Sequence, residues 1–432
     1  MFLKFLQKIL AYLAKITVRR YKPLIIGITG SVGKSSTREA IALVLKDKFK
    51  IRQSAKNYNN EIGVPLTILG LPSPEGSVIG WFGVIFLALI KIIFKAKSYP
   101  DILILEMAAD RPGDIEYLTK IVSCKIGVLT AVNVAHIEFF KNIENILKEK
   151  QTLITSLPFD GWAVLNYDDE RTKSLYKKTA AKVITFGFSE GADLRAIGLE
   201  IDQELSENGL EINGLRFKMS YQGNVVPVFL PKTIGFSQVY SALSALAVAI
   251  ALGQNLIDTI FYLNNYKPLS GRMSLIRGIK NSLIIDDTYN SSPEAVKSAL
   301  DTIEKIKINQ HNNKWLVLGD MLELGEISQK AHYEIGKKVA QSNSNFLIVV
   351  GSESQNIAKG ARDGGFNSEN ILSFSNILGV EEFLNNRIKS GDLILVKGSQ
   401  GMRMERIVKD LMESPRLAKK YLVRQNRRWL KK

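Results

Sequence analysis

The chain has 432 residues, of which 46% are hydrophobic and 23% charged, as expected for a globular protein of two or three domains. Its net charge of +16 is concentrated at the two ends: residues 1–22 carry six basic and no acidic residues, and residues 411–432 carry eight basic residues and one acidic. The body between them is almost neutral, which argues against nucleic acid as a partner, because a nucleic-acid enzyme carries its basic charge around the active site.

The first 22 residues have the pattern of a basic amphipathic helix. Apolar residues recur at helical spacing from Phe2 to Ile16, with lysines between them. Such a helix suits the surface of an anionic membrane. It suits a docked position on the body of the protein equally well, so the sequence leaves both open. A signal peptide is disfavoured, because lysines interrupt the apolar run and no small-residue cleavage site follows.

Residues 23–266 predict a first α/β domain. Apolar strands alternate with helical stretches, which is typical of a mostly parallel sheet. The strands are expected at 24–29, 102–107, 126–130, 163–166 and 183–186, and an alanine-rich helix at 239–252. Residues 192–230 alternate apolar and polar around Asn208-Gly209 and Asn213-Gly214, which predicts antiparallel hairpins around these dipeptides.

Residues 267–410 predict a second, Rossmann-like α/β domain, followed by a basic tail at 411–432. Its strands are expected at 282–286, 314–318, 346–350, 371–374 and 393–396, with helices from about Pro293, Ser328, Val380 and Met402.

A glycine-rich segment, Thr29-Gly30-Ser31-Val32-Gly33-Lys34-Ser35-Ser36, lies between the first predicted strand and a helix. Such a loop points backbone N–H groups and a helix N-terminus at phosphate oxygens. Lys34 would neutralise the β- and γ-phosphates and Ser35 would bind Mg²⁺. A standard P-loop has a glycine where this chain has Ile28.

Residues 78–94 form an apolar stretch of seventeen residues whose one charged residue is Lys91, close to the lower limit for a membrane span. A span would place the glycine-rich loop and Glu106 on opposite sides of the bilayer. Because both are expected to serve one nucleotide, we predict a buried or surface-lying helix instead. An exposed apolar face on it would add to any membrane contact.

Further motifs follow the loop in a fixed order. They are NYNNEIGVP at 57–65, Glu106 with RPGDI at 111–115, NVAH at 133–136, VLNYDD at 164–169, GRM at 271–273, DDTYNSSP at 286–293, LGDMLELG at 318–325 and KGS at 397–399. This ordered set resembles the Mur ligase family. The last three motifs resemble in particular the branch that adds D-alanyl-D-alanine.

The resemblance implies a P-loop central domain and a C-terminal domain that closes over the nucleotide. It implies an ATP-dependent, ADP-forming ligase that activates a carboxylate as an acyl phosphate. The expected substrates are a UDP-MurNAc-peptide and D-Ala-D-Ala, and the expected cofactors are ATP and Mg²⁺. Transfer of the γ-phosphoryl group requires mainly positioning and cations, which agrees with the residues at hand.

Carried over onto this sequence, the family's site residues fall into three groups. Nucleotide contacts are expected from Gly30, Ser31, Gly33, Lys34, Ser35, Ser36, Asn60, Arg272, Asp286, Asp287, Tyr289 and Asn290. Metal contacts are expected from Ser35, Glu106, His136 and a carbamylated Lys150. Catalytic roles are expected for Lys34, His136, Lys150 and Arg272, and Lys397 with Asp320 would line the amine-substrate site.

The sequence departs from the family pattern in three places. The family's G-x-H-x-x-x-N has Ser237 and Ser241 instead of His and Asn, and its K-x-E has Thr152 instead of Glu. About 22 residues precede the first strand, so the usual N-terminal UDP-binding domain is expected to be missing. A superfamily ligase for another acid and amine, including a lipid-linked acid, therefore stays open, as does a membrane-associated nucleotide-binding protein without catalysis. A cytoplasmic location is expected, with peripheral membrane contact through 1–22, 78–94 and 411–432.

Overall fold

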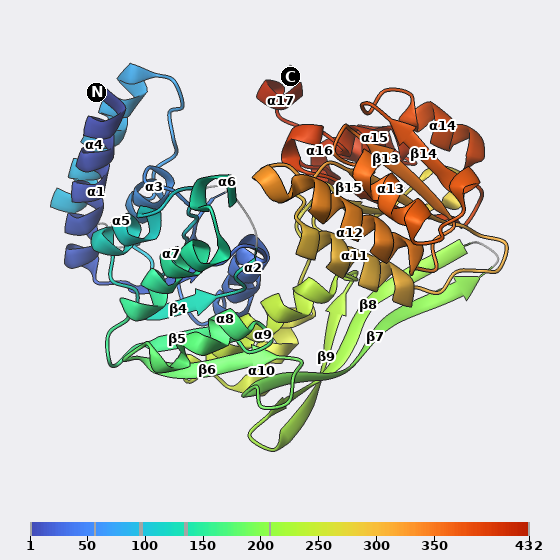
Figure 1. Cartoon of the computed structure of the whole chain (residues 1–432). Coiled ribbons are helices and arrows are strands. Elements are labelled where there is room, and N and C mark those ends of the chain that lie inside the picture. Colours follow the sequence, from blue (N-terminus) through green and yellow to red (C-terminus); the bar gives the residue numbers. More distant parts are fainter. Residues whose placement is uncertain (1, 56–57, 95–97, 134–136, 207–208, 431–432) are drawn as a thin grey trace.

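The computed structural model describes residues 2–55, 58–94, 98–133, 137–206 and 209–430. These residues form two sheets, each covered by helices on both faces (Figure 1). The predicted α/β class, with a parallel-rich sheet in each half, is confirmed.

The first sheet has the strand order β2-β3-β1-β4-β5-β6-β7-β8-β9 in the described part of the chain. Its N-terminal strands are β1 (Leu24–Thr29), β2 (Ile51–Gln53), β3 (Ile102–Glu106), β4 (Ile126–Leu129), β5 (Trp162–Asn166) and β6 (Lys182–Gly187). β1 pairs in parallel with β3 on one side and β4 on the other. The carboxyl ends of these three strands therefore meet at one edge, where such sheets bind their ligands.

Antiparallel strands β7 (Leu194–Ser206), β8 (Gly209–Tyr221) and β9 (Asn224–Pro231) extend this sheet. Asn208 lies outside the described residues. The prediction of a hairpin around Asn213-Gly214 was wrong, because both residues lie inside β8. Asp202 pairs with Gly214 whereas Gln203 pairs with Ile212, so Asn213 is the extra residue of a β-bulge.

Helices cover both faces of the first sheet. On one face lie α2 (Lys34–Leu45), α9 (Phe236–Ala251) and α10 (Leu256–Leu263). On the other lie α5 (Asp114–Ile121) and α7 (Ile143–Thr155), and the connections include α6 (Ile137–Phe140) and α8 (Glu170–Lys173). Both faces of the sheet are apolar, as a helix-covered parallel sheet requires.

The second sheet has the order β10-β11-β15-β12-β13-β14 among the described residues. Its strands are β10 (Ser274–Arg277), β11 (Leu283–Asp287), β12 (Lys314–Gly319), β13 (Phe346–Val350), β14 (Ile371–Phe374) and β15 (Leu393–Lys397). β10 runs antiparallel to β11, and the remaining pairs are parallel. The helices on its faces are α11 (Pro293–Lys305), α12 (Ser328–Ala340), α13 (Gln355–Asp363), α14 (Val380–Arg387) and α15 (Glu405–Leu411).

Three helices form a separate layer at the N-terminal side: α1 (Phe2–Tyr21), α3 (Gly63–Leu69) and α4 (Val78–Ile93). Leu6, Leu10 and Leu13 of α1 are buried against α3 and α4, so α1 docks on the protein through one face. Figure 1 shows α1 and α4 side by side. In the described residues, no helix combines the length and the apolar character needed to cross a membrane.

The C-terminal residues from 411 to 430 pack on the second domain. Ala418 and Leu422 are buried in the core beside α15, and short helices α16 (Ala418–Tyr421) and α17 (Arg427–Leu430) follow. Arg424 is also buried, in an ion pair with Glu405 at 2.8 Å. These contacts bring the expected basic tail against the folded domain.

Candidate active site

The glycine-rich loop joins β1 to the N-terminus of α2. Gly30 and Gly33 have φ angles of 147° and 83°, which glycine adopts without strain. A Cβ atom on Gly30 would lie 1.9 Å from the hydroxyl oxygen of Thr130, just beyond β4. Ile28, where a standard P-loop has its first glycine, is a buried residue of β1. The loop therefore begins two residues later and opens into a pocket lined by Gly33, Lys34 and Ser35.

Lys34 lies close to charged side chains from several parts of the chain. Its Nζ donates a hydrogen bond to the carbonyl oxygen of Gly30 at 2.7 Å. Burial lowers the pKa of Lys34; Glu106 opposes this shift, Arg272 adds to it, and Asp110 again opposes it. These three residues come from separate parts of the chain, so both domains contribute to the electrostatics of the loop lysine.

Glu106 ends β3 directly beside the loop. Its carboxylate accepts hydrogen bonds from the Ser35 hydroxyl at 2.9 Å and the Asn59 amide at 3.1 Å, and pairs with Arg38 at 3.2 Å. The structure thus brings together Ser35 and Glu106, two of the expected metal contacts. A serine hydroxyl and one carboxylate facing a phosphate loop are the oxygen donors that Mg²⁺ takes alongside phosphate oxygens. His136 lies outside the described residues.

Lys150 is buried in α7, whereas Lys148, two residues earlier, is exposed. Burial lowers the pKa of Lys150 to about 7, and the charge of Lys34 contributes to this shift. The adjacent Glu149 accepts backbone hydrogen bonds from Gly113 at 2.7 Å and Ile115 at 2.6 Å, and so fixes α7 against the start of α5. A lysine amine with this pKa is largely neutral above pH 7, which is the form that reacts with carbon dioxide.

Arg272 reaches the loop from the other domain. Its guanidinium lies over the ring of Tyr289, 4.1 Å from the centroid. Together with Tyr289 and Asn290 it lines a cavity of about 300 Å³ that Lys34 and Glu106 line as well. Arg272 of the second domain and Lys34 of the first therefore line the same cavity.

The two aspartates that end β11 have different surroundings. Asp286 accepts hydrogen bonds from its neighbour Thr288 at 2.6 and 3.2 Å, and burial raises its pKa to about 6. Asp287 lines a cavity of about 690 Å³ and forms an ion pair with Lys397 at 2.6 Å. Lys397 also donates to the Asn290 carbonyl at 3.1 Å. Of the pair, Asp287 is thus the one placed to meet a ligand.

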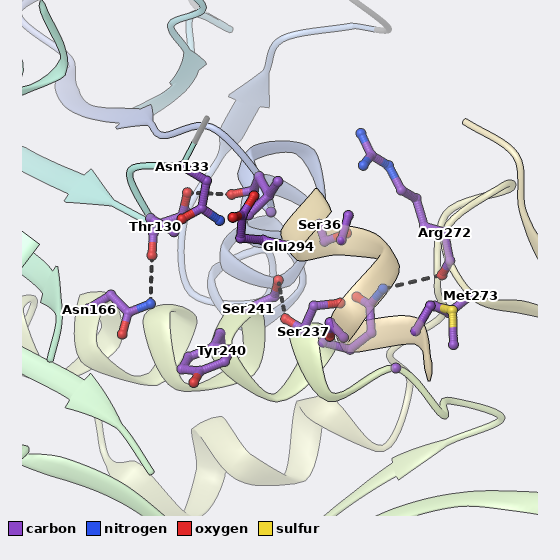
Figure 2. A pocket seen from close by; sticks show the side chains of 18 of the residues that line it. Ser36, Thr130, Asn133, Asn166, Ser237, Tyr240, Ser241, Arg272, Met273 and Glu294 are labelled. Atoms are coloured by element: carbon purple, nitrogen blue, oxygen red, sulfur yellow. Dashed lines mark hydrogen bonds between the residues drawn. The ribbon is translucent and has the colours of Figure 1, made fainter. Parts of the chain in front are cut away.

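The large cavity of about 690 Å³ is lined by residues of both domains (Figure 2). Asn166 and Tyr240 stand on one side of it and Arg272 on the other, while Ser237 and Ser241 project from α9. These two serines stand where the family has His and Asn, so the departures noted in the sequence line this cavity. Ser36 and Asn290 line it as well.

Sequence reasoning missed the residues that shape the first-domain side of this cavity. Tyr240 donates a hydrogen bond to Asp168 at 2.9 Å, and Asp168 also accepts from the backbone of Phe188 at 2.7 Å and Ser189 at 2.9 Å. Asn166 donates to the Thr130 carbonyl at 2.8 Å. Asn166 and Asp168 belong to the VLNYDD motif at 164–169, which was the available signal.

Asn60 and Asp320, two of the residues predicted for the site, accept hydrogen bonds from backbone N–H groups. Asn60 lines the cavity that contains Lys34, and it also accepts a hydrogen bond from the backbone N–H of Gly63 at 2.9 Å, at the start of α3. Asp320 accepts from the backbone of Ser354 at 2.7 Å, just before α13, and does not line any of the described cavities. Asp320 thus holds the backbone just before α13, and Lys397 lines the large cavity.

The comparisons with known proteins agree with this arrangement. The Mur ligase middle domain matches residues 28–79 and 87–249, and the Mur ligase glutamate ligase domain matches residues 271–400. The UDP-N-acetylmuramoyl-tripeptide--D-alanyl-D-alanine ligase of Buchnera aphidicola subsp. Baizongia pistaciae is 30% identical, over 90% of this chain and 75% of that protein. The chain belongs to the Mur ligase family.

Other members of the family are similar over comparable lengths. The ligase of the same name from Bacillus subtilis is 28% identical, over 94% of this chain and 79% of its own. Among solved structures, the MurF ligase from Thermotoga maritima in complex with ADP has a TM-score of 0.76 and 28% identity. The match covers 95% of this chain and 84% of that one, so this Mur ligase shares both domains with it.

Proposed function

We propose that this chain is an ATP-dependent, ADP-forming ligase that joins D-Ala-D-Ala to the peptide carboxylate of UDP-MurNAc-tripeptide. One observation carries the ATP chemistry: Lys34 and Glu106 of the first domain and Arg272 of the second line one cavity. The names of the relatives support the choice of substrates.

The reaction has two steps. The substrate carboxylate oxygen attacks the γ-phosphorus of ATP, ADP leaves, and an acyl phosphate forms. The amine then attacks the acyl carbon, phosphate leaves, and the nitrogen loses a proton to give the amide. The first step develops charge on the phosphoryl oxygens, which Lys34 and the planar fork of Arg272 are placed to stabilise.

Magnesium is part of this proposal. Ser35 and Glu106 would hold the ion, and Lys150, if carbamylated, would add a second anionic group. The ion would supply further charge neutralisation at the phosphates. The described residues contain no cluster of three or more His, Cys, Asp or Glu side chains able to hold a metal. His136, the remaining expected metal contact, stays part of the proposal, together with phosphate oxygens and water.

A neighbouring cavity of about 410 Å³ is the proposed site for the amine. It is lined by the loop residue Ser31, by Ser291, Ser292 and Ser399 of the second domain, and by Trp429. The hydroxyls of Ser291 and Ser292 are buried without a hydrogen-bond partner in the protein. Unpaired buried hydroxyls next to the phosphate loop suit a small polar ligand such as a dipeptide.

Phosphate release tests this proposal. We expect release from ATP and Mg²⁺ only when UDP-MurNAc-tripeptide and D-Ala-D-Ala are both present. Lys34→Ala should lower the rate by about a hundredfold or more, because it removes a charge from the transition state. The exposed Lys148→Ala is the matched control and should keep the parent rate. Phosphate release at the same rate without UDP-MurNAc-tripeptide or without D-Ala-D-Ala would contradict the assigned reaction.

ATP and a nucleotide-linked peptide are cytoplasmic compounds, and the buried free thiol of Cys124 is compatible with a reducing compartment. We therefore place the reaction in the cytoplasm, peripheral to the inner face of the membrane. Exposed apolar side chains of α4, among them Phe82 and Phe86, support the peripheral position.

A further inference from the structure

Helix α4 exposes an apolar face that the described residues leave uncovered. Its buried face consists of Trp81, Val84 and Ala88, which pack against α1 and α3. The opposite face carries large side chains that are more than half exposed: Ile79 85%, Phe82 67%, Phe86 64%, Ile93 64% and, at its end, Phe94 76%. Contiguous exposed residues of this kind mark an interaction site rather than ordinary surface.

Helix α1 has a mixed face of aromatic and basic residues. Phe5, Lys8, Tyr12, Lys15 and Arg19 follow one another at intervals of three or four, so they lie on one side of the helix. Phe5 and Tyr12 are 62% and 66% exposed. The other side holds the leucines that pack on α3 and α4. Helix α1 therefore presents two exposed aromatic rings together with basic side chains on the face that the protein leaves uncovered.

The two helices are joined into one unit. Arg20 donates to the carbonyl of Ile93 at 3.1 Å, Tyr21 donates to the carbonyl of Lys91 at 2.7 Å, and Lys91 donates to the carbonyl of Gly70 at 2.9 Å. These bonds tie the ends of α1, α3 and α4 together. The exposed faces of the two helices are therefore held in a fixed position relative to each other, and need little ordering on binding.

The charged residues of α1 and α4 are all basic. The first acidic residue of the chain is Glu39, and no acidic residue lies between Glu75 and Asp101. The segments that form α1 and α4 thus contribute lysine and arginine only. Pairing with a second copy would place these basic residues against one another, because a twofold interface buries the same patch from both chains. An anionic lipid surface has the complementary charge.

We propose that α1 and α4 together form a docking surface for an anionic membrane, with both helices lying in the plane of the headgroups. The phenylalanines and isoleucines of α4 enter the acyl boundary, and the lysines and arginines of α1 meet the lipid phosphates. This proposal does not depend on the ligase reaction.

The surface lies one helix away from the nucleotide site. Asn60 lines the same cavity as Lys34 and accepts a hydrogen bond from Gly63 at the start of α3. Leu66 and Leu69, further along α3, pack against α1 and α4. Docking therefore holds the site close to the membrane. The antiparallel strands β7 to β9 lie at the opposite side of the molecule (Figure 1).

Sedimentation with vesicles tests the proposal. We expect the full chain to bind vesicles of phosphatidylcholine with phosphatidylglycerol, and binding to weaken as salt rises. Phe82→Ser with Phe86→Ser should weaken binding by about tenfold or more, because two aromatic rings that would enter the acyl boundary of the membrane are lost. Phe159→Ser with Phe261→Ser, which changes exposed phenylalanines elsewhere, is the matched control and should bind like the parent.

A second pair of variants tests the charge. Lys8→Glu with Arg19→Glu should weaken binding by about tenfold or more, whereas Lys177→Glu with Lys178→Glu should have little effect. Thermal unfolding of each variant shows whether the fold is kept. Equal binding to neutral and anionic vesicles would overturn the proposal, as would an absence of binding together with dimerisation that Phe82→Ser abolishes.

Discussion

Burial changes the ionisation of several side chains at the site. It lowers the pKa values of Lys34 and Lys150, and it raises that of Asp286 to about 6. Folding therefore acts against the charged form of Lys34, which the proposed chemistry needs near phosphate, and favours the neutral amine of Lys150, which is the form that can be carbamylated. Such shifts are common where charged ligands bind, because the ligand supplies the charge that the empty site lacks.

Lys150 leads to a prediction about stability and pH. Its pKa falls from 10.5 in the unfolded chain to about 7 in the folded protein. Between these two pH values the Lys150 amine is protonated in the unfolded chain but largely neutral in the folded protein. The resulting destabilisation is absent above pH 10.5, grows as pH falls, and is complete below about pH 7. In buffer free of carbon dioxide, Lys150→Met should raise the free energy of unfolding at neutral pH by on the order of a few kcal/mol.

Urea unfolding at several pH values measures this effect. The gain should shrink as pH rises toward 10.5, and the exposed Lys148→Met should show no such pH dependence. Lys150→Met should also lower the rate of phosphate release, because the residue is proposed to act at the metal site. A loss of stability at every pH would mean that Lys150 is a structural residue.

Local signals predicted most elements, and the errors have physical causes. Asn213-Gly214 has the composition of a turn but lies in a bulge, because pairing with β7 decides its position. The sequence analysis did not identify α13, which packs on α12 through Gly336 and Gly360. A Cβ atom on either glycine would lie 2.1 Å from a carbonyl oxygen of the other helix. The helix expected from Met402 begins at Glu405, since Arg403 has a φ of 58°.

The C-terminal segment leads to a prediction about positioning. Arg424 donates to the carbonyls of Thr288 and Tyr289, and the Tyr289 ring supports the guanidinium of Arg272. Arg424→Lys keeps a cation beside Glu405 but loses the planar fork that reaches both carbonyls. We expect kcat to fall by about tenfold, roughly the loss of one hydrogen bond to a charged group.

Steady-state kinetics and thermal unfolding together measure the role of Arg424. The exposed Arg416→Lys is the matched control and should keep the parent kcat. A fall in kcat without a fall in melting temperature supports positioning. A fall in melting temperature with unchanged kcat would show that Arg424 only stabilises the fold.

The relative position of the two domains could not be predicted from local sequence patterns. The strand, loop and helix at the nucleotide site could be predicted, because glycine and lysine spacing determines them locally. The distances across the cavity could not, since more than 200 residues separate Lys34 from Arg272. Only the family resemblance suggested that these residues meet. Tyr240 and Asp168, which shape the large cavity, were missed because their contact also joins distant segments.

The most direct test of the ligase assignment is the mass of the product. The chain is incubated with ATP, Mg²⁺, UDP-MurNAc-tripeptide and D-Ala-D-Ala, and the nucleotide-linked peptide is analysed by mass spectrometry. We predict a product heavier than the substrate by the dipeptide minus one water, with one ADP formed for each product molecule. An unchanged peptide, under conditions where the chain demonstrably binds ATP, would contradict the assigned reaction.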